Sequence, residues 1–271
     1  MAATPSVPAV GIGRRLATQL DRTFAIVDYE VRKLRRDPSE LLLRAVQPAL
    51  WLLVFGEVFT QVHVIPTGNL TYLQFLAPGV LSQSVLFIAI FYGIASIRER
   101  ELGIIIKFLV SPARRMVLVG GRALSASLRG LSQAVVVMLI ATALSVRLDL
   151  TPLTVLGTVV AVILGSAAFS SLSMVIASLV RTQERFLDIG QLLTMPLFFA
   201  SNAIYPLAIM PAWLRPFAYA NPLTYLVDAL RQLMTPGAPT LFPLALDLGV
   251  LAGVTLGLVA LCAALYPRMA Q

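Results

Sequence analysis

Histidine, cysteine and lysine, three side chains that commonly bind metals or nucleotide phosphates, are scarce in this chain. His63 is the only histidine and Cys262 the only cysteine, so we expect neither a metal site nor an internal disulfide. A Walker A loop needs a lysine directly after a glycine to reach nucleotide phosphates, and neither Lys33 nor Lys107 follows a glycine. We therefore expect this chain to bind no cofactor itself, so that any ATP and Mg²⁺ it uses must bind to another chain.

Acidic residues within apolar stretches are the remaining candidates for chemistry, because an ionisable group is costly to hold in hydrocarbon. Glu57 and Asp188 lie inside apolar runs, and Asp228 and Asp247 lie near the ends of such runs. A proton-coupled transporter would need an acid at mid-membrane, but Glu57 and Asp188 are close to the ends of their runs, which favours interfacial or paired roles. No polar cluster suits a membrane-embedded enzyme, so we predict that the chain is not an enzyme.

The elements that carry these residues are predicted to lie in a membrane. The chain has 271 residues, of which 58% are hydrophobic and 13% charged, whereas soluble domains average roughly 25% charged. A helix needs about 20 mostly apolar residues to cross the bilayer. Six stretches qualify, and they predict an all-α polytopic membrane protein with six transmembrane helices: 41–61, 73–96, 117–145, 152–180, 186–207 and 241–266.

The distribution of basic residues predicts the orientation. With the N-terminus in the cytoplasm, 15 of the 21 lysines and arginines fall on inside segments and three on outside segments. Such a bias is typical of cytoplasmic loops. We therefore predict a multi-pass protein of the plasma (inner) membrane with both termini in the cytoplasm. Because topology accounts for the net charge of +8, nucleic acid is not an expected partner, whereas membrane lipid is.

The segment before the first span has the pattern of a helix that lies on a membrane surface. Phe24, Val27 and Val31 fall on one helical face of residues 16–37, while Arg32 and Lys33 lie off it. The segment could be a plain surface anchor, or a lever that transmits force from a cytoplasmic partner. We divide the chain into a cytoplasmic leader with this interface helix, 1–39, and a six-span domain, 40–271.

Between the second and third spans the chain carries a charged segment. The second span contains the pair Pro78-Gly79, where a kink or local unwinding is expected. It exits into Arg98-Glu99-Arg100-Glu101, followed by the apolar Ile104–Ile106 and then by Ser111-Pro112-Ala113-Arg114-Arg115. This pattern fits a short amphipathic helix on which a soluble partner docks, and it fits a solvated loop equally well.

The outer segment between the fifth and sixth spans is apolar but rich in proline. Pro206, Pro211, Pro216 and Pro222 prevent one continuous helix. Aromatic residues, typical of the membrane interface, are interspersed among them. We therefore predict short re-entrant helices that dip into the outer leaflet.

Taken together, these segments resemble the permease subunits of type-2 ABC exporters, in particular the daunorubicin-resistance branch. The resemblance covers about residues 14–268 and rests on motifs in three places. These are Phe75 with Pro78-Gly79, then Arg98 to Gly103 with Leu109, Ser111 and Pro112, and finally Pro211 to Leu214, Asn221 to Tyr225 and Ala229 to Arg231. One departure is Ile104–Ile106, where relatives usually have a more polar stretch.

The resemblance implies a transport function and partners. The permease would act as a dimer with a second copy or a close homologue, together with two copies of a separate ABC ATPase subunit. It would export a hydrophobic drug-like or lipid-like compound, as in multidrug and antibiotic resistance. Export of a lipid-linked glycan by the same architecture, or ion-coupled secondary transport, are the alternatives.

The resemblance also implies roles for four groups of residues. The ATPase-coupling loop would comprise Arg98, Glu99, Arg100, Glu101, Gly103, Ser111, Pro112, Arg114 and Arg115. The interface helix, with Phe24, Val27, Val31, Arg32 and Lys33, would move with that loop. The substrate path would be lined by Ser82, Gln83, Gln191 and Thr194. The outer re-entrant signature would comprise Pro211, Trp213, Asn221, Pro222, Tyr225 and Arg231.

Overall fold

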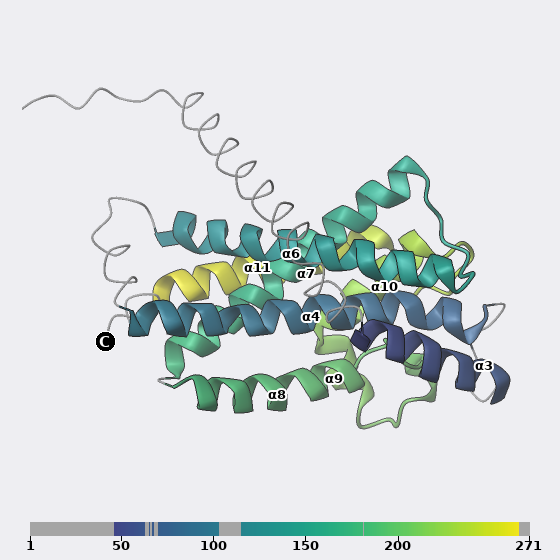
Figure 1. Cartoon of the computed structure of the whole chain (residues 1–271), viewed down its shortest axis with the longest axis horizontal. Helices are drawn as coiled ribbons and strands as arrows, with labels where there is room; N and C mark the ends of the chain where they lie inside the picture. The colour runs from purple at the N-terminus through teal and green to yellow at the C-terminus, as the bar shows by residue number, and fades with distance from the viewer. Residues whose placement is uncertain are drawn as a thin grey trace, which may run out of the picture. The chain divides into compact units, whose positions relative to one another are not determined.

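A computed structural model describes residues 46–62, 65, 67, 70–102, 115–180 and 182–265. Over these residues the chain is helical and contains no strand (Figure 1). The elements are η1 (Trp51–Gly56), α3 (Glu57–Val62), α4 (Tyr72–Glu101), α6 (Arg115–Ala143), α7 (Pro152–Leu179), α8 (Gln183–Phe199), η2 (Leu207–Ile209), α9 (Arg215–Ala220), α10 (Pro222–Met234) and α11 (Leu244–Leu265). The predicted all-α fold class is confirmed for this part of the chain.

Four of these helices are long and apolar enough to cross a membrane. These helices are Tyr72–Glu101, Val119–Ala143, Pro152–Leu179 and Leu244–Leu265. In the same order, they correspond to the predicted spans 73–96, 117–145, 152–180 and 241–266. The other two predicted spans, 41–61 and 186–207, fall on shorter helices, namely Val46–Thr60 and the 17-residue α8. The described residues thus contain four candidate membrane-spanning helices, and the count of six remains a prediction.

The predicted fifth span ends earlier than the apolar run that suggested it. Helix α8 stops at Phe199, and residues 200–205 form a turn and bends. A contact with α10 holds the segment after the stop, because the main-chain carbonyl oxygen of the buried Asn202 accepts a hydrogen bond from the Arg231 side chain. A helix of 17 residues is about 26 Å long, slightly less than the thickness of a typical hydrocarbon core.

Polar residues at the helix starts fix where the helices begin. Thr71 and Gln74 form a reciprocal capping box at the start of α4. Thr151 caps α7, and Asn221 caps α10 by accepting a hydrogen bond from Leu223 N at 2.9 Å. A proline follows each of these two caps, at a position where its missing N–H costs no helical hydrogen bond.

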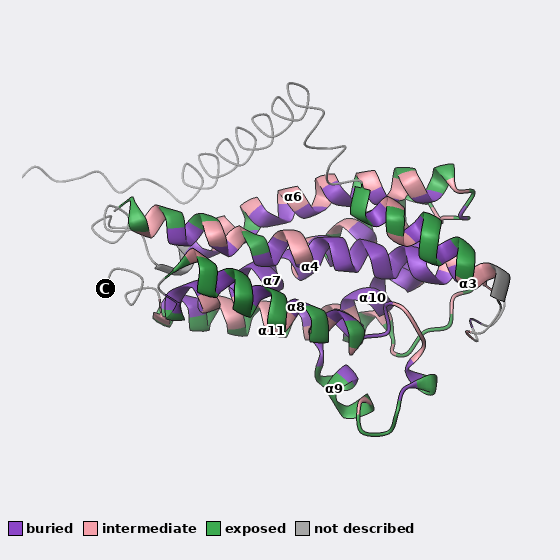
Figure 2. Ribbon diagram, turned by 60° about the horizontal axis from the view of Figure 1, so that its bottom comes forward, coloured by how far each residue is buried: buried purple, intermediate pink, exposed green. Residues whose placement is uncertain are grey.

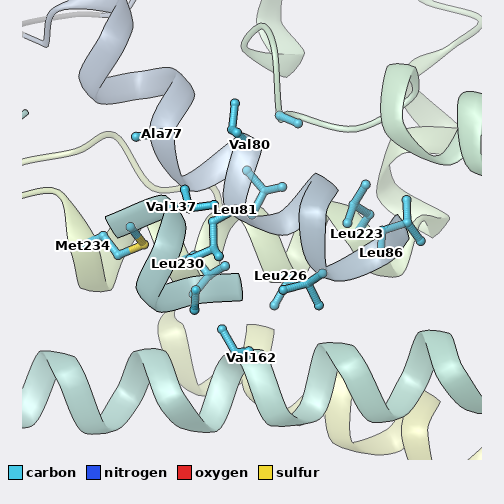
Figure 3. Close-up of a cluster of buried hydrophobic side chains, with 14 of the residues drawn as sticks. Ala77, Val80, Leu81, Leu86, Val137, Val162, Leu223, Leu226, Leu230 and Met234 are labelled. Carbon is cyan, nitrogen blue, oxygen red and sulfur yellow. The ribbon is translucent and has the colours of Figure 1, made fainter. Parts of the chain in front are cut away.

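Helix α7 is the centre of the bundle and packs against α4, α6, α10 and α11. Small side chains on α7 allow this close packing: a Cβ at Gly165 would lie only 2.6 Å from Leu226 Cδ2 of α10. Figure 3 shows how α10 contributes to the same apolar core, which includes Leu81 of α4, Val137 of α6 and Val162 of α7.

The outward faces of the bundle carry large exposed apolar side chains. Examples are Leu139 on α6, Leu192 on α8 and Leu256 on α11, each at least 65% exposed. Figure 2 shows exposed residues along α8 and α11, a mixture of buried, intermediate and exposed residues along α6, and a largely buried α4. Apolar side chains on the outside of an apolar bundle are what a surrounding lipid phase requires, so the structure agrees with a membrane-embedded protein.

The Pro78-Gly79 pair does not unwind α4. The helix runs without interruption from Tyr72 to Glu101, with Pro78 inside it. Gly79 instead permits close approach of the segment after α8, because a Cβ at this position would lie 2.3 Å from the carbonyl oxygen of Ala203. Of the expected kink or local unwinding, the unwinding is therefore wrong and the kink stays a prediction; the glycine has a packing role.

Candidate functional site

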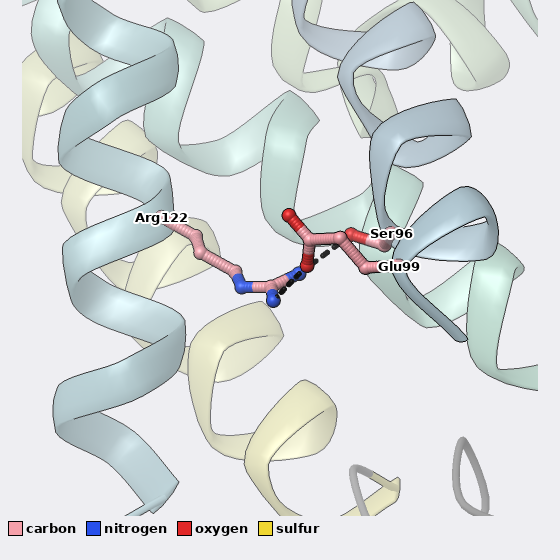
Figure 4. A network of polar contacts seen from close by, with 3 residues as sticks. All are labelled: Ser96, Glu99 and Arg122. Carbon is pink, nitrogen blue, oxygen red and sulfur yellow. Dashed lines mark hydrogen bonds and ion pairs between the residues drawn. The ribbon is translucent and has the colours of Figure 1, made fainter. Parts of the chain in front are cut away.

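The charged run Arg98–Glu101 forms the last turn of α4 and does not lie in a loop. Glu99 makes an ion pair with Arg122 of α6, and the other arm of the same guanidinium donates to Ser96 Oγ at 2.9 Å (Figure 4). The Arg122 side chain is only 15% exposed and that of Glu99 34%. This contact joins the end of α4 to α6.

Arg100 joins the same turn of α4 to α7. Its Nη2 donates to Val180 O at 2.8 Å and its Nη1 to Ala177 O at 3.4 Å. These carbonyl groups lie at the C-terminal end of α7, where they have no partner in the helix and where the helix dipole favours a cation. The last turn of α4 is thus fastened to both neighbouring helices.

The other predicted coupling residues are divided between exposed positions and positions that the structure does not describe. Arg98 and Glu101 are exposed on the last turn of α4. Arg115 is the first residue of α6, and only its backbone is described. Four of the coupling residues and all five of the interface helix lie outside the described residues: Gly103, Ser111, Pro112, Arg114, Phe24, Val27, Val31, Arg32 and Lys33.

Three of the four predicted path residues are buried within this single chain. Ser82 and Gln83 lie on α4 and Thr194 on α8, and these two helices pack together. The Ser82 hydroxyl donates to Pro78 O at 2.9 Å and the Thr194 hydroxyl to Gly190 O at 2.5 Å, so both bond to their own helix. Only Gln191 is exposed, on the surface of α8.

Residues of the predicted outer signature hold α9 and α10 in place. Asn221 caps α10 with its side-chain oxygen, and its amide nitrogen donates to Leu197 O at 2.7 Å and Ala200 O at 3.1 Å at the end of α8. The Tyr225 hydroxyl donates to Tyr219 O at 2.7 Å, which links α10 to α9. Pro222 is the first residue of α10, and Pro211 and Trp213 lie exposed just before α9.

Arg231, the last residue of that signature, is buried and bridges three segments. Its Nη2 donates to Asn202 O at 2.8 Å and to Phe75 O at 3.3 Å. The guanidinium also lies over the Phe75 ring, with its carbon 3.8 Å from the ring centroid, a cation–π arrangement. Arg231 therefore ties α10 to the start of α4 and to the segment that follows α8.

A second polar group on α10 was missed by the sequence analysis, which placed Asp228 and Asp247 separately near span ends. In the structure the two carboxyl groups meet at Gln232, whose amide nitrogen lies 3.1 Å from Asp228 Oδ2 and 2.9 Å from Asp247 Oδ2. Part of the signal was present in the sequence, because Asp228 and Gln232 are four residues apart on one helix and such side chains are neighbours.

Residues 21–235 match the family model described as ABC-2 type transporter. This matched range includes the turn of α4 fastened by Arg100 and also α10 with its buried Arg231. The chain belongs to the ABC-2 type transporter family. The resemblance inferred from the sequence motifs is thereby confirmed. As an ABC-2 permease the chain is a transmembrane subunit and not an enzyme, since the ATPase activity of such transporters lies on a separate subunit.

Several named permeases are similar to this chain over most of its length. The transport permease ycf38 of Cyanophora paradoxa is 30% identical over 219 residues, which cover 79% of this chain and 74% of the relative. The daunorubicin resistance ABC transporter permease protein DrrB1 of Streptomyces coeruleorubidus is 25% identical over 253 residues, 93% of this chain and 87% of the relative. The doxorubicin resistance permease DrrC of Mycobacterium tuberculosis is 26% identical over 230 residues, 84% and 80% of the two chains.

Proposed function

We propose that this ABC-2 permease is half of the membrane part of an ATP-driven exporter. Two copies, or one copy and a close homologue, form the substrate path, and two ATPase subunits bind at the cytoplasmic side. The exported compound is hydrophobic and drug-like or lipid-like, a choice supported by relatives named for daunorubicin and doxorubicin resistance. The structural observation that carries the proposal is the last turn of α4, which is fastened to α6 and α7 directly before the proposed docking segment.

The proposed topology has six spans and both termini in the cytoplasm. Helix α8 and the helix Val46–Thr60 complete the set begun by the four longer helices. Helices α9 and α10 do not cross but enter the outer leaflet and return. Their short lengths, 6 and 13 residues, and the exposed aromatic rings of Trp213 and Phe217 support an interfacial position.

The proposed mechanism uses α4 to carry movement from the docking segment to the outer helices. The transporter is in equilibrium between an inward-open and an outward-open arrangement. ATP shifts this equilibrium because the ATPase pair binds ATP more tightly in one arrangement than in the other. Closure of that pair displaces the 98–115 region together with the interface helix. With 30 residues, α4 is about 45 Å long, and its far end is held by Arg231 and by the close approach of Gly79 to Ala203.

In the same scheme α4 and α8 line the path between the two permeases. Gln191 is the one exposed residue among the four predicted path residues. Ser82, Gln83 and Thr194 are buried between helices of one chain, so they would reach substrate only in an arrangement where α4 and α8 separate.

The partner is tested by purifying the tagged chain from its native membrane and identifying the proteins that accompany it. We expect a Walker-A-containing chain to co-purify, and the reconstituted complex to export a hydrophobic dye in an ATP-dependent way. Transport by the isolated permease, driven by an ion gradient and abolished by an uncoupler, would overturn the proposal. If the complex transports a lipid-linked glycan and no hydrophobic drug, the proposed architecture stands and the proposed substrate is wrong.

The coupling role of the α4 end is tested with three variants. Glu101→Ala removes an exposed charge, whereas Glu99→Arg breaks the pair with Arg122 and Glu99→Arg/Arg122→Glu restores it with reversed charges. If Glu99 acts by bracing α4, the double variant recovers drug-stimulated ATP hydrolysis that the single variant loses. If Glu101 contacts the ATPase, Glu101→Ala lowers coupling without lowering the stability of the permease. Unchanged transport and ATP hydrolysis in all three variants would refute the assignment.

A further inference from the structure

The junction of α10 and α11 buries two carboxyl groups beside one neutral amide. Asp228 of α10 and Asp247 in the first turn of α11 are both fully buried. The amide nitrogen of Gln232 lies within hydrogen-bond distance of one oxygen of each. Two negative charges placed this close in a buried site repel one another strongly, and a neutral amide offsets only part of that repulsion.

The hydrogen bonds around Gln232 do not balance if both acids are ionised. Its Nε2 carries two hydrogens but has three oxygens around it: Asp247 Oδ2 at 2.9 Å, Phe242 O at 3.0 Å and Asp228 Oδ2 at 3.1 Å. The two hydrogens of Gln232 Nε2 therefore cannot serve all three oxygens at once. In addition, Asp247 Oδ1 is buried, and no donor reaches it among the described residues.

The two acids differ in how well their charge is supported. Asp228 accepts hydrogen bonds from the backbone N–H groups of Leu241, at 3.0 Å, and Phe242, at 3.1 Å, as well as from Gln232. Asp247 accepts only from Gln232 among the described residues. Hydrogen bonds from N–H groups stabilise a carboxylate, so Asp228 is the better site for the negative charge and Asp247 the better site for a proton.

The charged groups on the surrounding helices form their hydrogen bonds and ion pairs with partners other than Asp247. Arg231 of α10 donates to main-chain carbonyl groups of Phe75 and Asn202, and its positive charge also attracts the Asp228 carboxylate. On α6, Arg122 pairs with Glu99 and Arg129 lies over the Tyr92 ring.

Phenol groups complete the titratable surroundings. Tyr225 of α10 donates to Tyr219 O of α9, and Tyr72 of α4 donates to Ile204 O. Helix α7 contributes no titratable side chain at all. Asp149, just before α7, accepts from Thr151 N. Among the described residues, none of these groups bonds to Asp247. The nearby positive charge of Arg231 supports the negative charge on Asp228, and no cationic side chain in the described part of the chain is paired with Asp247.

We propose that Asp228 and Asp247 form a buried proton-binding site, in which a single proton is held on Asp247 and the charge on Asp228. The bound proton supplies the missing hydrogen and removes one of the two charges. When it leaves to solvent, both acids are ionised, and the α10–α11 contact and the connecting residues 235–243 are weakened. The site lies just beneath the exposed connection that contains Leu241, through which the proton enters and leaves.

Infrared difference spectroscopy on the full chain in lipid nanodiscs tests the proton directly. At neutral pH the wild-type protein should show the C=O stretching band of a protonated carboxyl, shifted by exchange into D₂O and lost as the pH is raised. Asp247→Asn should remove the band. Glu57→Gln, which alters an exposed carboxylate, should leave it in place. The wild-type pH titration remains decisive even if Asp247→Asn does not fold.

Thermal unfolding gives a second, independent measurement. The Tm of the wild-type chain should fall as the pH rises from about 5 until the proton leaves Asp247, because over this range the folded chain keeps a proton that the unfolded chain has released. Asp247→Asn, whose amide keeps a hydrogen at this position, should lose most of that fall. Absence of the infrared band at neutral pH would overturn the proposal. So would a wild-type Tm that rises with added sodium, potassium or calcium chloride while that of Asp247→Asn does not, because the site would then hold a metal cation. Neither measurement depends on the ATPase partner.

Discussion

Substitution of Gly79 by alanine should destabilise the permease, although alanine is the better helix former. The added Cβ would lie 2.3 Å from the carbonyl oxygen of Ala203, against an ordinary contact distance of at least 3.4 Å. The segment after α8 would have to move by about 1 Å to relieve this contact. Its retreat is opposed by two hydrogen bonds, from Arg231 to Asn202 O at 2.8 Å and from Tyr72 to Ile204 O at 3.1 Å.

The net effect of Gly79→Ala follows from these terms. Overpacking of a close-packed site costs about 1–3 kcal/mol, and a weakened hydrogen bond adds about 1 kcal/mol. The helix propensity of alanine offsets about 0.5–1 kcal/mol. We therefore expect a loss of about 1–3 kcal/mol, seen as a Tm lower by on the order of 5 °C.

The control is Gly253→Ala on α11, where no atom lies within 4 Å of the added Cβ. There the propensity gain acts alone, so the Tm should rise slightly. Both variants are measured by thermal unfolding in the same detergent, with folded protein quantified by size-exclusion chromatography. A Gly79→Ala variant as stable as Gly253→Ala would refute the packing role of Gly79.

Three further substitutions test the polar contacts, each by the same thermal assay. Asn221→Asp keeps the cap of α10 but turns an oxygen toward two carbonyl groups, so it should lose about 2–4 kcal/mol and be less stable than Asn221→Ser. Arg231→Lys should lose about 2 kcal/mol, because one ammonium group cannot reproduce the planar contacts of the guanidinium, and equal stability would contradict that reasoning. Ser173→Ala removes the hydroxyl that donates to Ile90 O, and it should cost about 1 kcal/mol.

The spans were predictable from the sequence where the signal is local. Hydropathy summed over about 20 residues finds a helix such as α7 without any knowledge of its neighbours. The caps are local as well, since Thr151-Pro152 and Asn221-Pro222 are both polar residues followed by proline. The position of the segment after α8 was not predictable in this way, because it depends on Arg231, which binds Asn202 O from 29 residues further along the chain.

The residues of the candidate site could be predicted from the sequence, but the directions and contacts of their side chains could not. The run Arg98–Glu101 identified the correct end of α4, but the sequence gives no reason for Glu99 and Arg100 to turn inward while Arg98 and Glu101 stay exposed. That difference depends on Arg122 and on the carbonyl groups at the end of α7. The meeting of Asp228 and Asp247 likewise depends on the path of the connection between α10 and α11, which no local pattern specifies.

Both ends of α4 are held by arginines that bind main-chain carbonyl groups. At one end Arg100 of α4 binds Val180 O, and at the other Arg231 binds Phe75 O of α4. A carbonyl group in a membrane protein must find a donor within the protein, and a guanidinium supplies several donors from one side chain. Between these ends the contacts of α4 are largely apolar and close-packed. A close-packed interior is hardly compressible, so a displacement at one end of α4 is passed on to the other end. In the proposed exporter, α4 is therefore the element through which a push beside Glu99 reaches α10.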